Sequence, residues 1–121
     1  HLFWQGMDPV MAIRELGGAI HFFHAKDTKL DIANIARNGE LDLKRYGKMN
    51  ERSWTFRTVG YGHGMQEWNS IVSELRMNGY DDVISIEHED GLMSGHEGLC
   101  KAISFLQQVL MTEEPSRMYW A

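Results

Sequence analysis

Two apolar strands, each followed further along the chain by an amphipathic helix, constrain the fold more than any other feature. Residues 19–27, "AIHFFHAKD", and residues 81–90, "DDVISIEHED", have the Ile-, Val- and Phe-rich pattern of strands buried on both faces. Apolar residues at helical spacing occupy 65–80 and 94–110, and a shorter helix precedes the first strand. This alternation predicts parallel strands joined by right-handed crossovers.

Two strands are too few for a stable sheet, because both edges of the pair expose unpaired backbone groups. A (β/α)8 barrel takes about 250 residues, and this chain has 121. The predicted fold class is therefore α/β, with the chain forming the last βα units of a TIM barrel that is incomplete here. We expect one partial domain over residues 1–121, and the opening "HLFWQG" resembles the middle of a protein.

Residues 28–64 are the least regular part of the sequence and are too long for an ordinary connection. They mix short alternating stretches with glycines, and they contain the aromatic residues Tyr46, Trp54, Phe56 and Tyr61. We therefore expect an ordered but irregular insertion over about 28–64.

Composition argues against several classes of partner. The net charge is -5 and the 12 Lys and Arg residues are scattered, so they form no basic face of the kind that binds nucleic acid. No apolar run approaches the roughly 20 residues that span a bilayer, and no signal peptide is recognisable. The single cysteine, Cys100, excludes an internal disulfide. The sequence thus predicts a cytoplasmic protein that binds neither nucleic acid nor membrane.

Alternate strand residues face the interior of a barrel, and reactive groups lie at the carboxyl ends of its strands. On the first strand, the residues expected to face inward are Ile20, Phe22, His24 and Lys26. On the second strand they are Val83, Ser85 and Glu87. Both strands therefore end by directing a metal-competent side chain, His24 or Glu87, into the mouth of the barrel.

A histidine at the end of an apolar strand is more often hydrogen-bonded structure than a metal ligand. An inward carboxylate is harder to explain without a metal, because burying it without a cation or donors is costly. His24 and Glu87 together indicate a divalent metal site, with a purely structural histidine as the open alternative. Mixed imidazole and carboxylate ligands suit Mn²⁺, Co²⁺, Fe²⁺ or Zn²⁺ better than Ca²⁺.

Three motifs, "HAKD" at 24–27, "RTVGYGHG" at 57–64 and "VISIEHED" at 83–90, closely resemble the C-terminal part of the sugar phosphate isomerase/epimerase family. This xylose isomerase-like barrel group also includes tagatose/psicose 3-epimerases, inosose dehydratases and endonuclease IV. The resemblance covers nearly the whole chain. It implies a metal-dependent isomerase or epimerase that moves a proton next to the carbonyl of a sugar or sugar phosphate.

The resemblance also implies roles for individual residues. In such enzymes one divalent metal is held by Glu, Asp, His and Glu from four successive strands. His24 matches the histidine ligand, and Glu87 matches the last glutamate, which also serves as the catalytic acid/base in the epimerases. The other two ligands would precede His1. His1 and Arg57 resemble substrate-contacting positions of the family, although the longer insertion here separates Arg57 further from "HAKD".

Three other residues are candidates for substrate contact. Lys26 and Asp27 could anchor sugar hydroxyls or orient His24, and the alternative is that they pair with each other. Trp4 could form a wall of the sugar pocket, although a large aromatic residue is more often plain core.

Two other functions remain open at this point. An inosose-type dehydratase would share the fold and these residues, and a non-catalytic half-barrel could bind a sugar or assemble through its open strand edges. We expect the isolated chain to be inactive, because it supplies two of four ligands, and to form homo-oligomers that cover its edges. Chelator-sensitive proton exchange on a ketose would indicate the enzyme; sugar binding indifferent to chelator would indicate the binding module.

Overall fold

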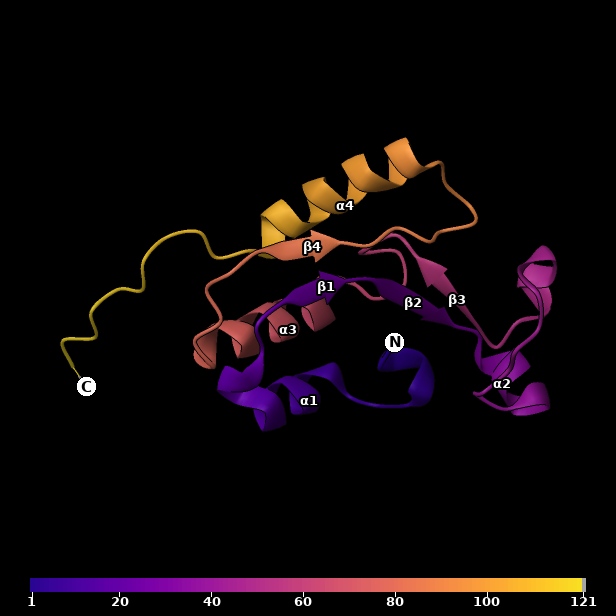
Figure 1. The fold of residues 1–121 in the computed structure, drawn as a ribbon, viewed down its shortest axis with the longest axis horizontal. Coiled ribbons are helices and arrows are strands. Elements are labelled where there is room, and N and C mark those ends of the chain that lie inside the picture. Colours follow the sequence, from indigo (N-terminus) through magenta and orange to yellow (C-terminus); the bar gives the residue numbers. More distant parts are fainter. Residues whose placement is uncertain (121) are drawn as a thin grey trace.

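The computed structural model describes residues 1–120 and contains short strands alternating with helices (Figure 1). The helices are α1 (Pro9–Leu16), α2 (Ile32–Asn38), α3 (Met65–Met77) and α4 (Gly95–Val109). The strands are β1 (Phe23–Ala25), β2 (Asp27–Leu30), β3 (Trp54–Arg57) and β4 (Ile84–Ile86). Single 3-10 turns are η1 (Phe3–Gln5) and η2 (Gly17–Ala19), whereas η3 (Tyr46–Glu51) joins two such turns across a kink at Lys48.

Strands β1 and β4 pair in parallel, as the sequence predicts. Phe23 lies opposite Ile84 and Ala25 opposite Ile86, and the Glu87 amide continues the ladder to the Ala25 carbonyl at 3.0 Å. The connection between these two parallel strands contains helix α3. This arrangement, with α4 following β4, is the αβ repeat of a barrel, and the chain is short enough to form only part of one.

Helices α1, α3 and α4 share one apolar core with β1. Its buried residues are Ile13, Ala25, Val59, Trp68, Ile71, Val72, Leu75, Ala102, Leu106 and Val109. Ile84 and Ile86 of β4 pack against this core while remaining partly exposed. The helices therefore cover one face of the β1–β4 pair.

Side-chain capping contacts mark the starts of two helices. The Asp8 carboxylate accepts a hydrogen bond from the Val10 amide at 2.9 Å, and Pro9 occupies the first position of α1. The Ser94 hydroxyl accepts from the Glu97 amide at 3.1 Å at the start of α4. Such caps satisfy backbone donors that the helix itself leaves free.

The first predicted strand is wrong in extent. Residues 17–19 form η2 and β1 begins at Phe23, so Ile20 precedes the strand and packs against the helix core rather than facing inward. At the other end, the chain leaves β1 after Ala25 and starts β2 at Asp27. The 3-10 turn that follows α1 includes Ala19, the first residue of the predicted strand, so the strand begins later than its apolar pattern suggested.

The expectation that 28–64 is irregular is wrong at its two strands, β2 and β3. Strands β2 and β3 form an antiparallel ribbon in which Thr28 lies opposite Phe56 and Leu30 opposite Trp54. Each strand has four residues, and such short stretches give a weak periodic signal until they are paired. Residues 31–53, which we call the insertion, connect the two strands and contain α2 and η3.

Candidate functional site

The two faces of the β1–β4 pair differ in what covers them. On the covered face, Phe23 and Ala25 pack against the helices. On the other face, which we call the open face, Phe22 is 51% exposed and Val83 is 56% exposed. Because side chains alternate along a strand, the predicted inward residues Phe22, His24, Lys26, Ser85 and Glu87 lie on this open face. A complete barrel would enclose it.

Lys26 and Glu87 meet at the carboxyl ends of the two strands. The Lys26 Nζ lies 2.7 Å from Oε1 of Glu87 and 3.2 Å from Oε2 of Glu89, and 4.4 Å from the centroid of the Phe56 ring. The lysine side chain is 4% exposed, whereas the two glutamates are about half exposed. Burial alone would lower the pKa of Lys26, but the hydrogen bonds and charges of Glu87 and Glu89 raise it above its usual 10.5.

His24 lies one step earlier on the same face. It is exposed, it is paired in register with Ser85, and its ring centroid is 4.9 Å from that of Phe22. Glu87 is two residues beyond Ser85, so the backbone offset between His24 and Glu87 along the strands is about 7 Å. The predicted ligands are thus neighbours on adjacent strands, and Glu87 already has a cation beside it.

The donor types at this site fit a divalent transition metal, since imidazole and carboxylate are ligands that such ions accept. Within residues 1–120, however, no group of three or more His, Cys, Asp or Glu side chains is placed to hold a metal ion. His24 and Glu87 therefore fit as part of a ligand set that needs donors from elsewhere.

The prediction that Asp27 binds substrate is contradicted by its surroundings. Its carboxylate is completely buried and accepts hydrogen bonds from the amides of Gly60, Gly62 and His63 at 3.0–3.1 Å. The His63 ring lies 2.8 Å away and the Trp68 indole donates at 3.3 Å. Burial alone would raise the pKa of Asp27, but these hydrogen bonds lower it. Asp27 instead fastens the glycine-rich turn to the end of the strands.

Arg57 is the last residue of β3 and lies opposite Asp27 in the ribbon. Its Nε donates to Oδ2 of Asp90 at 3.0 Å, and its side chain is 16% exposed. The same Asp90 oxygen accepts from the Thr58 amide at 2.8 Å. Burial raises the pKa of Asp90, but the backbone and Arg57 hydrogen bonds outweigh that effect and lower it. Arg57 is therefore oriented by Asp90, and none of residues 1–120 accepts a hydrogen bond from its terminal nitrogens.

His1 and Trp4 lie close together beside the ribbon. The Trp4 indole donates to Nδ1 of His1 at 3.3 Å and stacks on Trp54 with ring centroids 4.7 Å apart. The rings of His1 and Phe56 pack edge to face, with their centroids 5.2 Å apart. Since Lys26 lies over the same Phe56 ring, the structure brings His1, Lys26 and Glu87 into one neighbourhood.

Sequence reasoning missed Glu89 and Phe56 as members of this neighbourhood. The period of two in "EHED" was a usable signal for Glu89, because it places Glu87 and Glu89 on the same side. No comparable signal existed for Phe56, whose position depends on how β3 pairs with β2. His88, between the two glutamates, faces the covered side, where its ring packs against Gly98 of α4.

Comparison with known proteins agrees with this geometry. The family model described as "Xylose isomerase-like TIM barrel" matches residues 1–109. "Uncharacterized protein YfiH" of Bacillus subtilis (strain 168) is 38% identical over 110 residues, which cover 91% of this chain and 35% of that protein. The chain therefore belongs to the xylose isomerase-like TIM barrel family, and it spans about one third of the length of this relative. No helix within residues 1–120 is long and apolar enough to cross a membrane.

Proposed function

We propose that this chain is the C-terminal part of a divalent-metal-dependent isomerase or epimerase that acts on a sugar or sugar phosphate. The supporting observation is the convergence on the open face of a histidine from β1 and a carboxylate that follows β4, with a buried lysine beside the carboxylate. In an enclosed barrel this combination provides ligand, acid/base and charge in one place. Family membership supports a sugar as the substrate class.

His24 and Glu87 would hold the metal ion, and their donor types suit Mn²⁺, Co²⁺, Fe²⁺ or Zn²⁺. When bound, such an ion polarises a carbonyl and stabilises negative charge next to it. Glu87 takes and returns the proton on the carbon beside that carbonyl. Lys26 holds Oε1 of Glu87 at 2.7 Å, so it fixes the orientation of the carboxylate and leaves Oε2 for other contacts.

Substrate contacts follow from the same neighbourhood. His1 and the free terminal nitrogens of Arg57 provide donors for hydroxyl or phosphate oxygens. Trp4 provides an apolar wall, supported from behind by its stacking on Trp54. Asp27 takes no part in binding, because its carboxylate is fully engaged within the protein.

The proposal requires the rest of the barrel. Residues 1–120 supply two of the four expected ligands, so we propose that the isolated chain does not turn over a sugar. Strands β1 and β4 each have an outer edge without a partner strand in the part of the chain that the structure describes. Such edges favour pairing with the preceding strands of the barrel. We keep the prediction of a cytoplasmic protein.

Exchange of substrate hydrogen with D2O, followed by NMR on a panel of ketoses, tests the proposed reaction. The protein measured carries this chain together with the preceding barrel strands. We expect exchange that stops on addition of a chelator and falls at least about 100-fold in Glu87→Gln, the usual cost of losing an acid/base residue. Glu97→Gln, an exposed glutamate on α4, is the matched control. Sugar binding without exchange, unchanged by chelator, would establish the binding module instead.

A further inference from the structure

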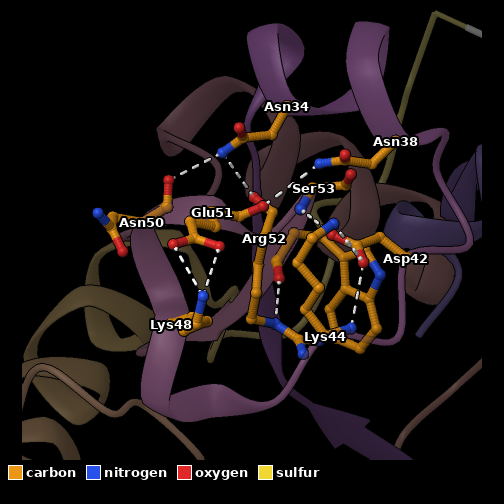
Figure 2. A network of polar contacts seen from close by, with 10 residues as sticks. Asn34, Asn38, Asp42, Lys44, Lys48, Asn50, Glu51, Arg52 and Ser53 are labelled. Carbon is orange, nitrogen blue, oxygen red and sulfur yellow. Dashed lines mark hydrogen bonds and ion pairs between the residues drawn. The ribbon is translucent and has the colours of Figure 1, made fainter.

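The insertion (residues 31–53) has the reverse of the usual distribution of polar and apolar residues. Figure 2 shows its interior contacts, which are polar: Asp42 accepts hydrogen bonds from the amide of Ser53 at 3.0 Å and from Lys44, and Asn34 donates to the carbonyls of Asn50 and Arg52. Neither α2 nor η3 contains a buried residue. The insertion is thus held together by hydrogen bonds and ion pairs rather than by an apolar core.

Two neighbouring leucines of the insertion are strongly exposed instead. Leu41 is 70% exposed and Leu43 is 84% exposed, while Asp42 between them is 8% exposed. Arg45, two residues further, is also exposed and has no carboxylate partner among residues 1–120, since Lys44 takes Asp42. Leu41, Leu43 and Arg45 are thus three exposed residues at alternate positions, which we call the leucine ridge. Adjacent large apolar side chains exposed in this way are typical of an interaction surface.

A surface of complementary shape and charge lies elsewhere on the molecule. A cavity of about 310 Å³ is lined by apolar side chains together with Tyr80 and Thr112. It is bordered by two aspartates and by Arg76, whose terminal nitrogens donate to the carbonyls of Met111 and Glu113, so its charged border has a net charge of -1. The apolar lining residues are Val72, Leu75, Val83, Ile84, Leu110 and Met111. Asp81 and Asp82 are exposed and form no ion pair within residues 1–120. We call this surface the aspartate cavity.

The two surfaces cannot meet within one copy. Figure 1 shows the insertion at one end of the molecule, beyond β2 and β3, and the start of β4, where the aspartate cavity lies, toward the other end. Charge also favours a contact between copies. The insertion has five Lys and Arg against four Asp and Glu, which gives it a net charge of +1. Because the whole chain has a net charge of -5, the residues outside the insertion have a net charge of -6. An unpaired arginine beside leucines matches aspartates beside an apolar hollow.

We propose that the leucine ridge of one copy of this chain docks into the aspartate cavity of a second copy. The contact is head-to-tail, because it joins two different surfaces, and repeating it produces longer assemblies. It is separate from association through the open strand edges and does not depend on the proposed catalytic function.

Sedimentation velocity on two complementary variants tests this arrangement. Leu41→Ser with Leu43→Ser removes the ridge and keeps the cavity. Asp81→Lys with Asp82→Asn alters the cavity, keeps the ridge, and retains an acceptor for the Val83 amide that Asp82 now holds at 2.7 Å. Leu16→Ser with Leu92→Ser, at sites 59% and 65% exposed, is the control pair. Circular dichroism melting curves establish that every variant is folded.

We expect the wild type and the control to form assemblies that grow with concentration, and each complementary variant alone to be monomeric. An equimolar mixture of the two variants should form a 1:1 dimer that grows no further, because one intact ridge and one intact cavity remain. A wild type that stays monomeric up to about 1 mM overturns the proposal. So does an assembly that survives in both variants, which indicates the strand edges, or one that survives in the cavity variant alone, which indicates a contact between two ridges. A mixture that stays monomeric also overturns it, because one intact ridge and one intact cavity would then not bind each other.

Discussion

The covered and open faces of the β1–β4 pair are built from neighbouring residues with opposite functions. Asp27 on the covered side is completely buried and receives donors from the glycine-rich turn, the His63 ring and Trp68. Lys26, one residue earlier, is equally hidden but directs its ammonium to glutamates that are half exposed. The Asp27 carboxylate has all of its contacts within the protein, whereas the Glu87 carboxylate retains a free oxygen and an accessible side.

This difference between the two faces separates the groups that stabilise the fold from the groups that are available for chemistry. A charged group that is saturated by its own protein stabilises the fold and is unavailable to a ligand. A charged group whose contacts are only partly made is available for ligand binding, and the open face concentrates such groups at the strand ends. In barrel enzymes this end of the strands is the one that carries the active site. We therefore expect substitutions on the covered face to change stability and substitutions on the open face to change binding.

The largest expected effect is that of Asp27→Ala. Removing this carboxylate leaves buried amide, imidazole and indole donors without an acceptor, which we expect to lower the free energy of unfolding by about 3–5 kcal/mol. Glu89→Ala, on the open face, is the control and should cost less than about 1 kcal/mol. Urea unfolding followed by tryptophan fluorescence measures both. Equal costs for the two variants would remove the distinction between the faces.

Adjacent phenylalanines give a closer test of the same distinction. Phe23 packs against the core, whereas Phe22 is 51% exposed. We expect Phe23→Ala to cost about 2–3 kcal/mol, below the range for a fully buried ring, and Phe22→Ala to cost less than about 1 kcal/mol. Thermal and urea unfolding of both variants provide the comparison. A larger loss for Phe22→Ala would mean that the open face is packed in solution.

Gly98→Ala tests how closely the covered face packs against α4. A methyl group at Gly98 would overlap the His88 ring, whereas a methyl group at Gly95 meets nothing within 4 Å. Alanine favours a helix over glycine by about 1 kcal/mol, so only steric overlap can make Gly98→Ala destabilising. We expect a net loss of about 1–2 kcal/mol for Gly98→Ala and no loss for Gly95→Ala. Two stabilised variants would show that His88 does not pack against α4.

The smallest expected effect is a dependence of stability on acid. Burial raises the pKa of Asp42, but the Lys44 ammonium and backbone amides outweigh burial and lower it from 3.8 to about 2. A carboxyl whose pKa is lower in the folded state stabilises the fold above its unfolded pKa and loses that contribution as pH falls toward its folded pKa. Urea midpoints should therefore decline between about pH 4 and pH 2, and Asp42→Asn should reduce the decline. An unchanged slope in Asp42→Asn would contradict this origin.

Sequence reasoning succeeded where a local signal was strong. Apolar residues at helical spacing predicted the two longer helices, which the structure places at Met65–Met77 and Gly95–Val109, and apolar strands predicted the parallel pair. Alternation correctly placed Lys26 and Glu87 on one face. It failed for Ile20, because the glycines after α1 form a 3-10 turn that delays the strand.

The remaining features depend on pairing between distant segments. Asp27 looked like a substrate-contacting residue because five of its six hydrogen bonds come from residues 60–68, more than 30 positions away, and only one from the adjacent Thr28 amide. The β2–β3 ribbon was missed for the same reason, since four-residue strands stabilise one another only when paired. Phe56 and Arg57 reach the site through that ribbon, so no spacing in the sequence reveals their neighbours.

Binding of Mn²⁺ to the 121-residue chain, followed by electron paramagnetic resonance, tests whether the strand ends hold a metal ion, because it detects weak binding without requiring turnover. We predict one weak site that is lost in His24→Ala and in Glu87→Gln and kept in His96→Ala and Glu97→Gln, which change the same residue types on exposed positions of α4. Binding that is unaffected by His24→Ala and Glu87→Gln, or that is lost equally in the α4 variants, would contradict a metal site at the strand ends.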